Sequence, residues 1–102
     1  MDYWEKNNLV KPQQVVVCAA NRLEDGTILC GARHWDKVMC KQADMMGLSE
    51  EKPIRCEQGF INQFGEFLTR KESMQVVKEN GQPFNKKRNG NQDIELYSEG
   101  LY

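Results

Sequence analysis

The chain has 102 residues, of which 28% are charged, and its formal net charge at pH 7 is −1. This length and composition are typical of one globular domain with a modest core rather than of a disordered chain. The near-neutral charge argues against binding to DNA or RNA polymers, and the lack of a long apolar run argues against a membrane span or a signal peptide. We therefore expect one cytoplasmic domain over residues 1–102, with a polar lead at residues 1–13 draped on its surface and anchored by Tyr3 or Trp4.

The first half of the chain predicts a β-hairpin. In "QVVVCAANRLEDGTILCGAR", β-branched residues favour strands near 14–22 and 27–33, and Asp25-Gly26 between them is a typical turn pair. The apolar run 15–20 does not alternate with polar residues, which predicts a strand covered on both faces, one of them by a second subunit if necessary.

A helix is predicted next. Trp35, Val38, Met39, Ala43 and Met46 share one face at helical spacing. Asp36 is expected in the first turn and Gly47 at the end, while the segment "LSEEKPIRC" is expected to be a loop.

The second half repeats this organisation without repeating the sequence. A hairpin turning at Phe64-Gly65 is followed by a helix that a Thr69–Glu72 capping box begins and Gly81 ends. The resulting order is ββα–ββα with an extended C-terminal tail. It predicts a small single α+β domain, in which two hairpins build an antiparallel sheet with two helices.

The four cysteines are 12, 10 and 16 residues apart, without a Cys-x-x-Cys pair, and the chain has a single histidine. This spacing does not match the usual zinc sites, so we expect reduced thiols and no metal. No glycine-rich phosphate loop, convincing carboxylate pair or metal triad is found, which favours a binding protein over an enzyme.

Three groups of residues have side chains suited to an anionic ligand. Arg33 and His34 lie at the expected junction of strand and helix, where Asp36 could orient His34 and where His34 is otherwise a hydrogen-bonded structural residue. Trp35 fits the apolar face of its helix better than a base-stacking role. The other two groups are Gln58, Gly59 and Arg70, with Gly59 suited to a close backbone approach or an unusual dihedral, and the loop that holds Phe84, Asn85, Arg88 and Asn89.

Four fragments, in the order "GARHWDKVM", "EQGFINQFGEFLTRKES", "GQPF" and "LYSEGLY", resemble a family of small phage proteins, the first family of Thoeris anti-defence sponges. The resemblance covers about residues 15–102, with Gly100 where the family pattern has aspartate. It implies a protein of the host bacterial cytoplasm that binds cyclic ADP-ribose isomers made by immune TIR-domain enzymes and sequesters them without cleavage. It also implies dimers, some assembled into hexamers, with the pocket at the dimer interface, and in some members a separate site for cyclic di- or trinucleotides.

For this chain, the resemblance and the residue chemistry together imply a site without catalytic residues, metal or cofactor. We expect Arg33, Arg70 and Arg88 to bind the phosphates, and the ring of Phe60, Phe84 or Tyr97 to stack on the adenine. Ribose or base edges are assigned to Gln82, Asn85 and Asn89, while His34 and Gln58 shape the pocket. Two alternatives remain open: a small nucleotide phosphodiesterase or hydrolase that uses His34, and a direct protein inhibitor of a host enzyme.

Overall fold

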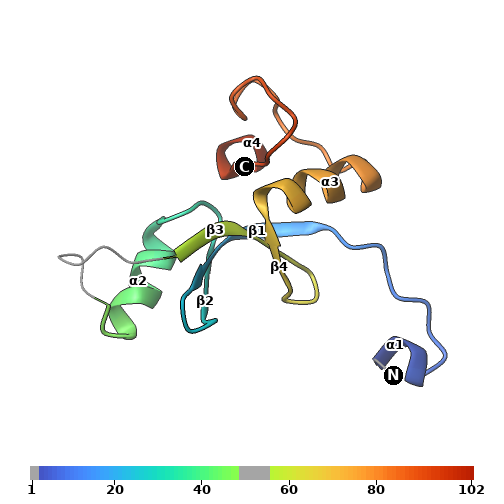
Figure 1. Cartoon of the computed structure of the whole chain (residues 1–102), viewed down its shortest axis with the longest axis horizontal. Coiled ribbons are helices and arrows are strands. Elements are labelled where there is room, and N and C mark those ends of the chain that lie inside the picture. The colour runs from blue at the N-terminus through green and yellow to red at the C-terminus, as the bar shows by residue number, and fades with distance from the viewer. Residues whose placement is uncertain (1–2, 49–55) are drawn as a thin grey trace.

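The computed structural model describes residues 3–48 and 56–102. Within them, the strands are β1 (Val16–Leu23), β2 (Ile28–Gly31), β3 (Cys56–Asn62) and β4 (Phe67–Thr69). The helices there are α1 (Tyr3–Lys6), α2 (Lys37–Met45), α3 (Arg70–Asn80) and α4 (Ser98–Leu101) (Figure 1). The expected α+β class and ββα–ββα order are confirmed, and the short helices α1 and α4 were not expected from the sequence. Most of the expected loop at 48–56 lies outside the described residues.

The strands form one antiparallel sheet in the order β2-β1-β3-β4, so β1 joins the two hairpins. Ala20 lies opposite Cys30 on one side and Gly59 on the other. Residues 19–21 are fully buried, as a strand covered on both faces requires. The start of β1 is different, because Val17 is 38% exposed where a bulge interrupts the pairing with β3. The prediction of a doubly covered strand therefore holds for the centre of β1, whereas the single chain leaves Val17 near its start partly uncovered.

The turn and capping signals lie where the sequence placed them. Gly26 and Gly65 adopt positive φ angles in the two hairpin turns, and Gly81 ends α3 with a φ of 71°. The capping box is formed, since the Thr69 hydroxyl accepts from the Glu72 N–H at 3.1 Å and the Glu72 carboxylate accepts from the Thr69 N–H at 3.0 Å. These local interactions fix both ends of α3.

The start of α2 differs from the expectation. Asp36 is the N-cap rather than a residue of the first turn, and its carboxylate accepts from the Met39 N–H at 2.9 Å. Trp35 precedes the helix with a φ of 55° and does not head its apolar face. This arrangement requires Gly31, because a Cβ there would lie 2.4 Å from the Asp36 carboxylate.

Helices α2 and α3 share one hydrophobic core with the sheet. Its largest fully buried apolar side chains are Phe60, Leu29, Met39, Met74, Leu96, Val16 and Val77. Leu96 brings the C-terminal tail into this core, so that the tail and α4 lie on the same side of the sheet as α3 (Figure 1). All four cysteines are free, as expected, and burial raises the pKa of the Cys18 thiol to about 11.

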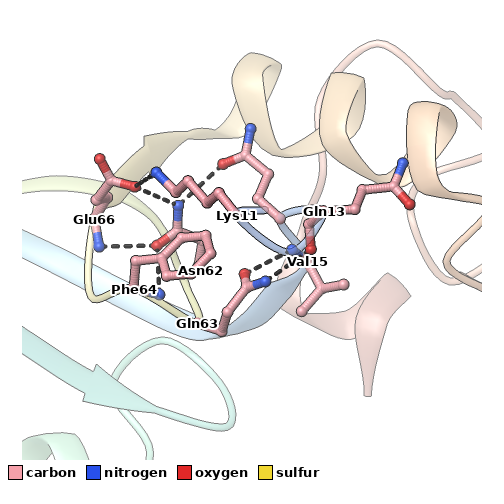
Figure 2. A network of polar contacts seen from close by, with 8 residues as sticks. Lys11, Gln13, Val15, Asn62, Gln63, Phe64 and Glu66 are labelled. Carbon is pink, nitrogen blue, oxygen red and sulfur yellow. Dashed lines mark hydrogen bonds and ion pairs between the residues drawn. The ribbon is translucent and has the colours of Figure 1, made fainter. Parts of the chain in front are cut away.

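The polar lead is attached to the β3–β4 turn (Figure 2). Gln63 donates to the Gln13 carbonyl at 2.7 Å and accepts from the Val15 N–H at 2.8 Å. Lys11 lies over the Phe64 ring, and Trp4 meets the same ring edge-on with a centroid separation of 6.0 Å. Of the two aromatic residues proposed as anchors, Trp4 therefore contacts the folded domain.

Candidate functional site

The candidate site lies where four segments meet: the β2–α2 connection, the start of α3, the loop after α3 and the C-terminal tail. Residues 3–48 and 56–102 include no helix long and apolar enough to cross a membrane. The same residues bring together no group of three or more His, Cys, Asp or Glu side chains that could hold a metal ion. The side chains gathered at this site are those of arginine, amide, aromatic and histidine residues.

Arg70 is the first residue of α3, where the helix dipole disfavours a positive charge. Its guanidinium donates to the Gln58 amide oxygen and lies 4.7 Å from the centre of the Tyr97 ring. Its Nε is buried and has no hydrogen-bond partner among the described residues. Leaving a buried donor unpaired costs about 1–3 kcal/mol. An anion bound beside Arg70 would remove this cost and would also suit the dipole.

His34 connects the sheet to α4. Its Nε2 lies 2.8 Å from the Gly59 carbonyl oxygen and its Nδ1 3.3 Å from the Ser98 hydroxyl oxygen. This geometry suits a neutral ring in which Nε2 donates to Gly59 and Nδ1 accepts from Ser98. Burial lowers the pKa of His34 below its usual 6.5, and the nearby Arg70 charge lowers this pKa further, although the Gly59 bond opposes both. Both ring nitrogens are thus engaged in structural contacts.

Gly59 makes the approach of β3 to its neighbours possible. A Cβ at this position would lie 2.1 Å from the Leu68 carbonyl oxygen and 2.7 Å from the Phe67 ring. The expected close backbone approach at Gly59 is therefore confirmed, and the Gly59 carbonyl is the one that His34 contacts.

Two further arginines, Arg33 and Arg88, meet at the end of the tail. The Nη2 atoms of Arg33 and Arg88 donate to the same backbone oxygen of Tyr102, at 2.7 and 3.1 Å. The Tyr102 hydroxyl donates to the Val17 carbonyl, which ties the tail across the start of β1. Beside this point is an open cleft of about 360 Å³, lined by Pro83, Phe84, Asn85, Arg88, Gly100, Leu101 and Tyr102. Phe84 and Asn85 are thereby placed next to Arg88, as the sequence suggested.

Three residues expected to contact a ligand instead have structural roles. Phe60 is 0% exposed in the core, so its ring is not available for stacking on a base. The Gln82 amide bonds to both the N–H and the carbonyl of Val16, at 3.0 and 2.7 Å. Buried Asn89 donates to two carbonyls of the tail loop and accepts from the Tyr97 N–H at 2.7 Å, which uses all its polar atoms.

Three residues of the tail were not singled out as site residues. Ser98 contacts His34, and Tyr102 contacts Arg33 and Arg88. Gly100 allows the tail to pack on Asn89. A Cβ at Gly100 would lie 2.6 Å from the Asn89 Cβ. Gly100 is therefore matched to Asn89, a pairing that no local sequence signal reveals.

The fold and the site define a small single-domain α+β protein with arginine, amide and aromatic groups gathered over one side of an antiparallel sheet. Residues 15–102 match the model of the family described as Phage T4 y16D protein. Because the match covers most of the chain, the protein belongs to this phage protein family. No curated protein and no solved structure matches the chain.

Proposed function

We propose that this phage protein binds a cyclic ADP-ribose isomer in the host bacterial cytoplasm and sequesters it without cleavage, which inhibits Thoeris-type immunity. The observation that carries the proposal is the buried Nε of Arg70, an unpaired cationic donor beside an amide and an aromatic ring. Membership of a phage family supports a role in a bacterial host.

The side chains around Arg70 match the groups of such a ligand. Guanidiniums suit its two phosphates, the Tyr97 ring offers a face for the adenine, and the Gln58 amide suits a ribose hydroxyl or a base edge. Arg33 and Arg88 offer a second cationic position on the same side of the sheet. Binding rather than turnover is favoured by His34, whose two nitrogens already contact Gly59 and Ser98.

We further propose that the protein acts as a dimer-based homo-oligomer, up to a hexamer. The strand register places Cys18, Cys30, Ile61 and Phe67 on the sheet face opposite the Phe60 core. All four are only partly buried in the single chain. A second copy that covered this face would bury their apolar surface, which a chain of this size needs for stability.

A depletion experiment tests the proposal. The purified protein is incubated with cyclic ADP-ribose isomers, and separately with cyclic di- and trinucleotides, and the free nucleotide is measured by mass spectrometry before and after heat denaturation. We expect depletion in proportion to the protein added and recovery of the intact mass after heating. Native mass spectrometry of the same sample reports the subunit count and the bound mass.

Arg70→Gln and Lys78→Gln form a matched pair for this experiment. Lys78 lies further along α3, is exposed and is paired with Asp93 at 3.5 Å. We expect Arg70→Gln to lose at least about tenfold in affinity, since a charge-assisted contact contributes about 1.5–3 kcal/mol, and Lys78→Gln to bind as the parent does. Absence of depletion by the parent protein would reject the proposal, and recovery of a cleaved nucleotide would favour a hydrolase.

A further inference from the structure

We propose that Tyr102 is a displaceable occupant of an anion site formed by Arg33 and Arg88, and that a phosphate group of the ligand replaces it there. This inference concerns the regulation of the proposed site, and it rests on the proposed function only for the identity of the natural ligand.

The first argument is the convergence of two like charges. Arg33 comes from the β2–α2 connection and Arg88 from the loop after α3, yet both guanidiniums donate to one oxygen of Tyr102. Neither forms an ion pair with a side-chain carboxylate within residues 3–48 and 56–102. Two guanidiniums held this close repel each other unless an acceptor lies between them. Tyr102 provides that acceptor in the structure.

The second argument compares the acceptors. A phosphate presents several anionic oxygens, whereas Tyr102 presents one backbone oxygen to the two guanidiniums. Guanidiniums bind phosphate in a two-pronged geometry, so a phosphate can accept two parallel hydrogen bonds from each arginine, where Tyr102 accepts one from each. A phosphate in this position therefore competes well with Tyr102.

The third argument is that the tail is buried at Leu96 and Ser98 but half exposed at Tyr102. Leu96 and Ser98 are buried, and the Leu96 N–H donates to the Arg70 carbonyl at 3.0 Å. Tyr102 is 50% exposed and is held by the two arginines, by its N–H to the Ser98 carbonyl, and by its hydroxyl to the Val17 carbonyl. The last residues can therefore lift away while the tail stays anchored at Leu96 and Ser98. Their release would also widen the cleft that Tyr102 lines beside Phe84 and Asn85.

Hydrogen exchange of the parent protein tests the displacement directly, with inorganic pyrophosphate as the probe. The Tyr102 N–H donates to the Ser98 carbonyl at 3.0 Å, so its exchange reports whether the tail end is docked. We expect saturating pyrophosphate to speed exchange at residues 101–102 and to leave the buried residues of α3 unchanged. Unchanged or slower exchange at residues 101–102, or no binding of pyrophosphate, would overturn the proposal.

A pair of tyrosine variants gives an independent measurement. Tyr102→Phe removes the hydroxyl bond to Val17 and keeps the ring, and Tyr3→Phe is the matched control in the exposed helix α1. We expect Tyr102→Phe to bind pyrophosphate about two- to tenfold more tightly, because binding then breaks one hydrogen bond fewer, and Tyr3→Phe to equal the parent. Equal affinities for both variants would contradict displacement.

The two proposals fail separately. If pyrophosphate releases the tail while cyclic ADP-ribose isomers are not depleted, the displacement holds and the proposed function is rejected. If those isomers are depleted while residues 101–102 remain protected, the proposed function holds and the displacement is rejected.

Discussion

Replacing Gln82 with alanine tests whether this residue supports the fold or contacts a ligand. The Gln82 amide bonds to both polar backbone atoms of Val16, a residue that is only 2% exposed. The substitution leaves the backbone N–H and carbonyl of Val16 without these partners at a partly buried position. At about 1–2 kcal/mol for each group, the expected loss in the free energy of unfolding is about 2–4 kcal/mol. For a domain of this size, such a loss lowers Tm by at least about 8 °C.

Gln63→Ala is the matched control. The Gln63 amide makes the same two kinds of contact, with the Val15 N–H and the Gln13 carbonyl, but at an exposed position in the β3–β4 turn (Figure 2). Water replaces these bonds when the side chain is removed, so we expect a loss below about 1 kcal/mol.

Urea unfolding of the parent and both variants, followed by tryptophan fluorescence, measures these losses. Nucleotide affinity is then measured at a temperature where Gln82→Ala is still folded, and we expect it to equal that of the parent. Equal destabilisation by the two variants would refute the burial argument. A large loss of affinity in a Gln82→Ala protein of unchanged stability would assign Gln82 to the ligand site instead.

Two further predictions concern the links between the tail and the sheet. The pKa of His34 is lower in the folded state than in the unfolded state, so below pH 6.5 the unfolded chain takes up a proton more readily than the folded one. The free energy of unfolding is therefore highest above pH 6.5 and falls as the pH is lowered below it. Urea unfolding between pH 7.5 and 5 should show this fall in the parent and a flatter profile in His34→Gln, whereas identical profiles would exclude His34 as its source. Gly100→Ala should cost about 1–3 kcal/mol by forcing a Cβ to within 2.6 Å of the Asn89 Cβ, and thermal unfolding that matched the parent would show that the tail can move aside.

The parts of the fold predicted from the sequence are those determined by local interactions. The two hairpin turns and the Thr69–Glu72 capping box depend on neighbouring residues alone. The order of strands was not predicted, because the pairing of β1 with β3 joins segments far apart in the chain. The start of α2 was placed too early because the spacing of Trp35 fits a helix, while the room that Gly31 leaves for Asp36 makes Asp36 the cap.

The candidate site was predicted by residue type, and that approach has a physical limit. Arg70 was chosen by its residue type, and the structure places it first in α3, where the helix dipole disfavours a cation. Gln82 and Asn89 carry the same amide group as a ligand-binding residue, but their amides are used to satisfy the backbone of the folded chain. Only the three-dimensional structure shows which amides remain available.

A protein with a net charge of −1 must concentrate positive charge locally if it is to capture an anion, since screening limits the reach of exposed charges to about 8 Å at physiological salt. Three cations elsewhere on the surface are paired with carboxylates: Lys11 with Glu66, Arg22 with Glu57, and Lys78 with Asp93. In contrast, Arg33, Arg70 and Arg88 bond to a backbone oxygen or an amide. None of the three therefore bonds to a side-chain carboxylate among the described residues. Under the proposed function, these three cations on one side of the sheet supply the local attraction for a ligand with two phosphates, although the whole chain has a net charge of −1.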